Sequence, residues 1–273
     1  MSRSKPLDLS GGPMQLTYLL PAPMHVTPLG EAEMRRRAGL LKQWAGDDTR
    51  ITVTAVDRGP ASVESAYEEY LAVPAMGTAL RRAEQGGADA VVLGCFGDPG
   101  LDGLREIADS PVVGPAAAAM SLACTLGHRF SIVTVADGVR PLLRRIAWET
   151  GVLDALHEVR SVELSVLAIN SDHDAAYEAL RAECANALAT GEADTLVLGC
   201  MSMGFLGAAE RLTAELGVPV INPIRAAVHH AQTLHRMGLS HSRHAYPLPP
   251  ALADDVVDTG LLREAEHSME VTA

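Results

Sequence analysis

The sequence is poor in aromatic residues, in basic residues and in long apolar runs. Phe, Trp and Tyr make up 4% of the 273 residues, which leaves few rings on which nucleic-acid bases could stack. Lys and Arg number 22 against 34 Asp and Glu, a formal net charge of −12. The charge argues against nucleic acid or an anionic membrane as partner, and a small-molecule substrate is the expectation that remains.

Signals for export or membrane insertion are also missing. The most apolar stretch, residues 112–126, is shorter than the ~18 residues a membrane span needs and contains Pro115, Ser121 and Thr125. Residues 1–13 lack the apolar core of a secretion signal and predict a leader outside the fold. Four cysteines without Cys-x-x-Cys spacing do not predict a disulfide framework. We therefore expect a cytoplasmic protein.

Short runs rich in Val, Ile and Leu alternate with longer helical patterns. Runs such as AVVL (90–93) and TLVL (195–198) are apolar at every position, as in parallel strands covered on both faces. The alternation predicts an α/β fold with parallel sheets. The expected strands are 15–20, 51–55, 90–93, 112–113, 130–135, 163–167, 195–198 and 220–221, and the expected helices are 30–45, 63–85, 101–109, 116–126, 141–150, 175–190, 207–215 and 225–237.

An internal repeat divides the chain into two halves. Shifted by 105 residues, Ala88–Cys95 (ADAVVLGC) aligns with Ala193–Cys200 (ADTLVLGC), with six of eight positions identical. Further on, Pro111–Pro115 (PVVGP) matches Pro219–Pro223 (PVINP), and each segment precedes a predicted helix. The repeat predicts two related α/β halves.

Both copies of the repeat end in a cysteine. Cys95 and Cys200 follow a glycine at the carboxyl end of a predicted strand, where open α/β sheets bind ligands. We expect the two thiols to face each other across a cleft and nearby helix N-termini to lower their pKa. A thiolate base on one face of a carbon and a thiol acid on the other could then invert a stereocentre. The alternative is that both are small buried hydrophobes, the role expected of Cys124 and Cys184.

Three segments carry a family resemblance. They are Gly94–Asp102 (GCFGDPGLD), Leu126–Thr134 (LGHRFSIVT) and Leu198–Met203 (LGCMSM). They resemble motifs of the Asp/Glu/hydantoin racemase superfamily, above all its hydantoin and allantoin racemase branch. The resemblance extends over about residues 15–238.

The resemblance implies a fold and a mechanism. It implies two pseudo-symmetric Rossmann-like domains with parallel four-stranded sheets and the active site in the cleft between them. It also implies that Cys95 and Cys200 are the acid/base pair of a cofactor-independent racemase or epimerase, without a metal or organic cofactor, and that the chain forms a homo-oligomer. The expected domains are 14–115 plus 224–245, carrying Cys95, and 116–223, carrying Cys200, with tails 1–13 and 246–273.

Further candidates surround the two cysteines. The backbone N–H groups of the two residues after each cysteine could stabilise an enolate oxygen. Thr134 is expected near the cleft by analogy with the family, and Ser202 could offer a hydroxyl. Asp98 could orient a ligand, although an aspartate near a helix start is more often a partner of the helix dipole. The substrate-binding candidates are Phe96, Gly97, Thr134, Met201 and Ser202.

Other patterns predict no chemistry. Gly94-x-x-Gly97-x-x-Gly100 differs from the dinucleotide-binding fingerprint. Arg35–Arg37 lies on a predicted helix and is interpreted as a solvated face. The histidines near the end of the chain lack a metal-ligand pattern; they are His229, His230, His235, His241 and His244.

Alternative reactions stay open. Leu20–Met24 (LPAPM) stands where the family has a polar Asn-Pro-Asn-Thr turn. A hydantoin-like ring is the leading substrate expectation. The same fold could instead serve a cis/trans isomerase or a decarboxylase of small diacids, or a non-catalytic ligand-binding protein.

Overall fold

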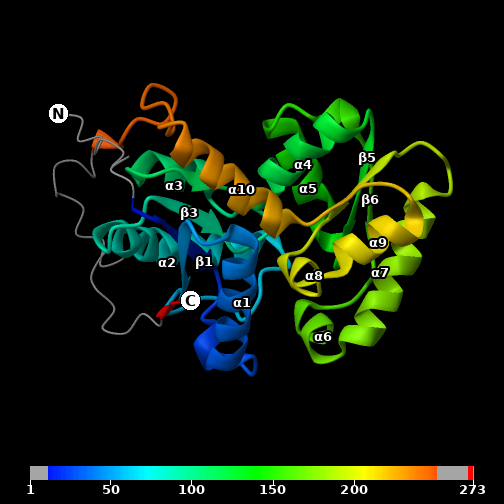
Figure 1. Ribbon diagram of the computed structural model, residues 1–273, viewed down its shortest axis with the longest axis horizontal. Helices are drawn as coiled ribbons and strands as arrows, with labels where there is room; N and C mark the ends of the chain where they lie inside the picture. Colours follow the sequence, from blue (N-terminus) through cyan, green and yellow to red (C-terminus); the bar gives the residue numbers. More distant parts are fainter. Residues whose placement is uncertain (1–11, 251–269, 273) are drawn as a thin grey trace.

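The computed structural model describes residues 12–250 and 270–272, and its two α/β halves lie side by side (Figure 1). The first half is built on parallel strands in the order β4-β3-β1-β2. Helices cover both faces, which is why these strands are apolar without alternation. Its elements are β1 (Met14–Leu20), η1 (Met24–Val26), α1 (Gly30–Ala45), β2 (Thr49–Ala55), α2 (Ala66–Gln85), β3 (Ala90–Leu93), α3 (Leu101–Ile107) and β4 (Val112–Val113).

The second half repeats this topology. Its parallel strands follow the order β8-β7-β5-β6, so the third strand again lies between the first and the fourth. The internal sequence repeat therefore reflects two copies of one strand order. Its elements are α4 (Pro115–Leu126), β5 (Phe130–Thr134), η2 (Asp137–Val139), α5 (Arg140–Glu149), η3 (Leu153–Ala155), β6 (Leu156–Ser161), α6 (Val166–Ser171), α7 (His173–Leu188), β7 (Thr195–Leu198), α8 (Met201–Phe205), α9 (Ala208–Leu216), β8 (Val220–Ile221) and α10 (Pro223–Arg236).

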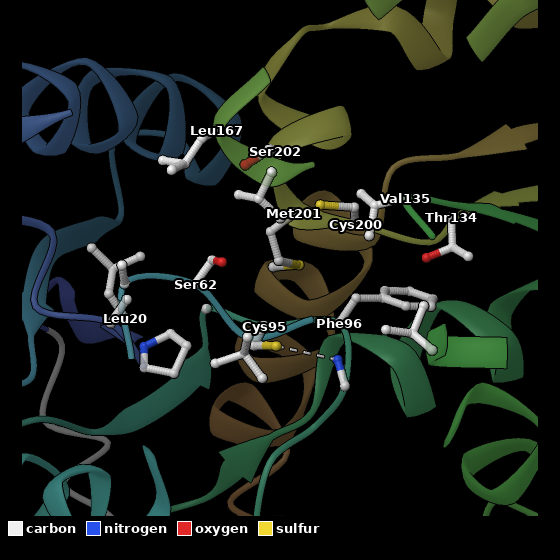
Figure 2. Close-up of a pocket in the computed structure, with 18 of the residues that line it drawn as sticks. Leu20, Ser62, Cys95, Phe96, Thr134, Val135, Leu167, Cys200, Met201 and Ser202 are labelled. Atoms are coloured by element: carbon white, nitrogen blue, oxygen red, sulfur yellow. Dashed lines mark hydrogen bonds between the residues drawn. The ribbon is translucent and has the colours of Figure 1, made fainter. Parts of the chain in front are cut away.

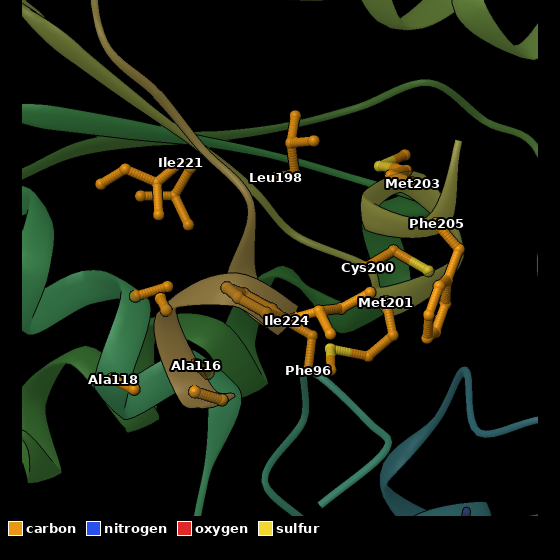
Figure 3. Close-up of a cluster of buried hydrophobic side chains, with 14 of the residues drawn as sticks. Phe96, Ala116, Ala118, Leu198, Cys200, Met201, Met203, Phe205, Ile221 and Ile224 are labelled. Carbon is orange, nitrogen blue, oxygen red and sulfur yellow. The ribbon is translucent and has the colours of Figure 1, made fainter. Parts of the chain in front are cut away.

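The helix that follows the fourth strand of each sheet packs against the other sheet. α4 follows β4 but packs against β5 and β7, whereas α10 follows β8 but packs against β1, β3 and β4. α4 and α10 also pack against each other between the two sheets (Figure 1). A continuous hydrophobic cluster results, with Phe96 of the first half among Cys200, Met201 and Ile224 (Figure 3). This packing fixes the two sheets relative to each other.

The predicted α/β fold with two parallel four-stranded sheets is confirmed, with one addition. β9 (Glu270–Thr272) pairs antiparallel with β2 as a fifth strand of the first sheet. These residues were expected in the tail 246–273, so that expectation is wrong for them. The expectations for residues 1–11, 251–269 and 273 lie outside the described residues.

The strand predicted at 163–167 is wrong. The edge strand of the second sheet is β6, which buries only Leu156 and Val159. Its other side chains are polar and partly exposed, so it lacks the apolar run that marks the central strands. The more apolar 163–167 instead leads into α6, because the Ser165 hydroxyl accepts a hydrogen bond from the Ala168 N–H (3.2 Å) and caps that helix.

The helices begin and end close to their predicted positions. The predicted helix 30–45 has the same bounds as α1, and the bounds predicted for α4 and α10 differ from the observed ones by one or two residues. α6 and α8 were not predicted, because each is shorter than two turns. Within the described residues, no helix is both long and apolar enough to cross a membrane. Cys184 is buried as expected, whereas the prediction that Cys124 lies in the core is wrong because it is exposed on α4.

Candidate active site

Cys95 and Cys200 occupy equivalent places at the carboxyl ends of β3 and β7. The glycine before each is required because the central strand of the sheet passes close by. A Cβ on Gly94 would lie 2.9 Å from the Leu19 carbonyl oxygen, and a Cβ on Gly199 would lie 2.8 Å from side-chain atoms of β5. The two glycines thus let each strand run alongside its neighbour up to the cysteine.

One cavity between the two halves brings both cysteines together (Figure 2). Its volume is about 90 Å³. Met201 extends from the start of α8 toward the Cys95 loop (Figure 2). The sequence-predicted site residues all line this cavity: Cys95, Phe96, Gly97, Thr134, Cys200, Met201 and Ser202.

The wall of the cavity is mostly apolar. The segment 20–24 contributes Leu20 and Met24 to it. Among the described residues that line the cavity, Arg37 alone is charged. An apolar concave wall with a few polar groups is typical of a small-molecule site. The other apolar side chains include Leu29, Val63, Val135, Val139, Leu142, Leu143, Val166 and Leu167.

Burial raises the pKa of the Cys95 thiol to about 12. The Gly97 N–H donates to its Sγ (3.4 Å) and lowers the pKa in part. Cys200, Asp98 and Glu69 act in the opposite direction because each can carry negative charge. The expectation that a helix N-terminus lowers this pKa is wrong, because α3 begins six residues further along the chain.

Cys200 has a different environment. Burial also raises the pKa of its thiol, but the N–H groups of Met203 and Ser202 and the Arg37 guanidinium oppose that shift. Cys200 is the N-cap residue of α8, so the predicted helix start exists here. Desolvation outweighs it, and the net pKa shift is again upward.

Two of the polar candidates already have partners. The Thr134 hydroxyl donates to the Gly199 carbonyl (2.9 Å) and links β5 to β7, so its proton is not offered to the cavity. The Gly97 N–H is directed at Cys95 Sγ, so its predicted role as a donor to an enolate is wrong in this arrangement. The N–H groups of Phe96 and Met201 stay candidates for that role.

Comparison with known proteins assigns the family. The model of the Asp/Glu/hydantoin racemase family matches residues 30–231. The chain belongs to this family. It is 38% identical to hydantoin racemase of Pseudomonas sp. (strain NS671) over 202 residues, which covers 74% of this chain and 80% of that protein. It is 37% identical to hydantoin racemase of Paenarthrobacter aurescens over 207 residues, or 76% and 87% of the two chains.

A solved structure agrees with this assignment. Allantoin racemase from Klebsiella pneumoniae superposes with a TM-score of 0.79 at 31% identity, covering 86% of this chain and 94% of that one. The family resemblance expected from the cysteine motifs is therefore confirmed. The chain is a racemase, and hence an isomerase.

The sequence analysis missed the one charged residue among the described residues that line the racemase cavity. Arg37 is 3% exposed, and its Nη2 donates to Ser202 Oγ and to Asn170 Oδ1, both at 3.3 Å. The prediction of a solvated face holds for Arg35, whose side chain is 59% exposed, but is wrong for Arg37. A signal was present, because Arg37 follows Met34 by three residues on the buried face of α1.

Asp98 of the racemase caps a helix of the other half. Its carboxylate accepts hydrogen bonds from the N–H groups of Ala116 (3.0 Å) and Ala117 (2.9 Å) at the start of α4. A Cβ on Gly114 would lie 2.5 Å from the carboxyl carbon of Asp98, so the carboxylate fills the place of a side chain there. The sequence analysis considered Asp98 as a ligand-orienting residue or as a partner of a helix start, and the structure shows the second role. The Cys95 loop is thereby tied to α4.

Proposed function

We propose that the chain is a cofactor-independent racemase or epimerase in which Cys95 and Cys200 form a two-base pair. The observation that carries the proposal is their equivalent placement at the ends of β3 and β7, on one shared cavity. A substrate carbon held between them presents one face to each thiol. The substrate is a hydantoin-like ring with a stereocentre next to a carbonyl group.

The chemistry is a proton exchange across that carbon. One cysteine, as thiolate, removes the C–H proton, and the electron pair passes into the ring as an enolate. The other cysteine then donates its S–H proton to the opposite face. The carbonyl next to the stereocentre acidifies the C–H bond, and a thiolate whose pKa is raised by burial is a stronger base for that proton. The N–H groups of Phe96 and Met201 are proposed donors to the enolate oxygen.

The cavity wall favours one class of ring substituent. An apolar substituent at the stereocentre is desolvated by the Leu, Val and Met side chains of the wall. The polar ureido group of allantoin would lose hydration against the apolar part of this wall. A dicarboxylate would bring two negative charges against the single guanidinium that lines the cavity, that of Arg37. The wall therefore supports a ring with an apolar substituent over a small diacid.

Proton NMR in D₂O tests the proposal. Purified protein is incubated with single enantiomers of 5-substituted hydantoins, with allantoin and with a small diacid. We expect deuterium at the stereocentre and loss of optical rotation, fastest for apolar substituents. Deuterium exchange on the diacid and on no hydantoin would contradict the proposal.

Substitutions of the two cysteines test the mechanism. Cys95→Ser and Cys200→Ser should each lower the racemisation rate at least about a hundredfold, because an alcohol is a far weaker acid than a thiol. Cys124→Ser is the matched control, since that thiol is exposed on α4. Circular dichroism checks that each variant is folded. Racemisation retained in either folded active-site variant would exclude the two-base mechanism.

A further inference from the structure

The repeat makes the two cysteine positions equivalent, but their neighbours differ in charge. Three residues after Cys95 stands Asp98, whose N–H donates to the Cys95 carbonyl (3.2 Å). Met203 occupies the same position after Cys200. A buried acid thus lies beside one thiol, and an apolar side chain takes its place beside the other. The two thiols therefore differ in how easily each loses its proton.

Arg37 adds a cation on the Cys200 side alone. It reaches from α1 of the first half to Ser202 Oγ (3.3 Å), in the first turn of the helix that Cys200 caps. Its guanidinium carbon lies 4.7 Å from the centre of the Phe205 ring in the same helix. Asn170 of α6 donates to Ser202 as well (3.0 Å). This network holds the guanidinium at the Cys200 end of the cavity.

Ion pairing does not cancel the charge of Arg37. Glu33 accepts from Arg37 Nε (2.8 Å), but it also accepts two hydrogen bonds from Arg36 (2.6 and 2.8 Å). Two arginines thus share one carboxylate, and the cluster keeps a net positive charge. Burial raises the pKa of Glu33, but the hydrogen bonds and charges of Arg36 and Arg37 outweigh it and hold the pKa below its usual value. Glu33 therefore stays ionised.

We propose that Arg37 is a positioning residue that makes Cys200 the resting base and leaves Cys95 as the resting acid. The inference rests on the proposed two-cysteine mechanism. In a turnover from this resting state, Cys200 takes the proton from the stereocentre and Cys95 gives its own to the opposite face. The resting state returns when Cys200 releases a proton to water and Cys95 takes one from water.

The electrostatic environment of Cys200 supports this assignment. Arg37 lowers the pKa of its thiol, and Glu64, before α2, raises it. Tyr18 on β1 is fully buried, and burial raises the pKa of its hydroxyl, so Tyr18 stays neutral. Cys95, which faces Cys200 across the cavity, carries no charge as a thiol.

The environment of Cys95 is more acidic. Asp98 and Glu69 both raise the pKa of the Cys95 thiol, and the Gly97 N–H lowers it. Glu69 is 3% exposed on α2 and pairs with Arg145 of α5 (3.4 Å). Proton loss is therefore harder at Cys95 than at Cys200.

Thiol alkylation tests the proposal without any substrate. The full chain is treated with iodoacetamide across pH 7 to 11, and peptide mass spectrometry follows Cys95 and Cys200 separately. We expect the rate at Cys200 to rise at a lower pH than the rate at Cys95. In Arg37→Met, the Cys200 rate at pH 8 should fall about tenfold, because loss of a nearby opposite charge shifts a thiol pKa by about one unit or more. The Cys95 rate should change less than about twofold.

Two further variants separate charge from structure. Arg37→Lys keeps a cation and should restore much of the Cys200 rate, whereas the exposed Arg35→Met on the same helix should leave both rates unchanged. If Arg37→Met does not fold, Arg37→Gln replaces it, with circular dichroism as the check. An unchanged Cys200 profile in a folded variant, or equal shifts at both cysteines, would overturn the proposal. Alkylation needs no turnover. Absent racemisation would therefore count against the proposed function, whereas the alkylation rates of Cys95 and Cys200 could still be compared.

Discussion

The contact between Gly114 and Asp98 makes a sharp prediction for Gly114→Ala. Gly114 is the N-cap residue of α4 and has φ −82° and ψ 123°, a conformation that alanine adopts without strain. The added Cβ would lie 2.5 Å from the Asp98 carboxyl carbon and 2.7 Å from Leu101 Cδ2. The carboxylate must therefore leave the start of α4.

The expected cost has two parts. Overpacking of a filled site costs about 1–3 kcal/mol, and loss of the bonds from Asp98 to Ala116 and Ala117 costs about 0.5–2 kcal/mol, as for other helix caps. Replacing glycine returns about 0.4–1 kcal/mol through the unfolded state. These terms combine to about 0.5–4.5 kcal/mol, so the free energy of unfolding should fall by about 2.5 kcal/mol at the centre of the range. At about 2–4 °C per kcal/mol, Tm should fall by roughly 5–10 °C.

Thermal unfolding followed by circular dichroism measures the change. Gly103→Ala is the matched control, because a Cβ there meets nothing within 4 Å and the residue lies inside α3. That variant should be neutral or more stable by up to about 1 kcal/mol. Racemisation below the unfolding range should also drop in Gly114→Ala, because Asp98 anchors the Cys95 loop. A Tm within 2 °C of the unchanged chain would refute this reasoning.

The second half of the chain suggests how a lost cap of α4 could be restored. Asn222 stands at the position of Gly114, and its own side chain accepts from the Ile224 N–H (3.0 Å) to cap α10. The double variant Asp98→Gly with Gly114→Asn removes the Asp98 carboxylate and places the capping residue of α10 at the start of α4. It should be more stable than Asp98→Gly alone by about 1 kcal/mol. No gain would mean that the two caps are not interchangeable.

Three further predictions concern the cavity and its thiols. Because burial raises the pKa of Cys95 and Cys200 above the ordinary thiol value, kcat/KM should rise with pH from 7 to 9 as the thiolate fraction grows; a plateau beginning below pH 7.5 would contradict the raised values. Met201→Ala should increase kcat/KM for hydantoins with bulky substituents relative to small ones, at a cost of about 2 kcal/mol or more in stability, as competing-substrate kinetics and thermal unfolding would show. At neutral pH, alkylation should reach exposed Cys124 before buried Cys184, and peptide mass spectrometry would detect the reverse order.

The sequence predicted the place of both cysteines on the cavity because the internal repeat puts each of them at the end of an equivalent strand. Two strands followed by Gly-Cys, related by a constant shift, require the same local geometry twice. Parallel strands present their carboxyl ends at one edge of a sheet, so the residues after each cysteine were placed correctly. Fully apolar strands were found within one or two residues, whereas β6 was missed because this edge strand buries only Leu156 and Val159.

The errors at the site arise from contacts between distant parts of the chain. Arg37 was interpreted as solvated because two other arginines precede it on the same predicted helix, and its partners Ser202 and Asn170 lie more than 130 residues away. The thiol pKa values were expected to fall because the sequence shows the helix starts but not the depth of burial. In both cases the deciding quantity is desolvation, which tertiary packing sets.

A two-base racemase has to satisfy two requirements. The repeated Gly-Cys strand ends serve one of them, and the charged neighbours of the cysteines serve the other. The proton leaves one face of the carbon and the new proton arrives at the other, so a cysteine must stand on each face. Catalysis also requires one thiol and one thiolate at any moment, and unequal acidity decides which cysteine is the thiolate at rest. On the proposed mechanism, the repeat meets the first requirement through the shared Gly-Cys strand end. Asp98 beside Cys95 and Arg37 near Cys200 meet the second, because they break the symmetry in charge while leaving it intact in the backbone.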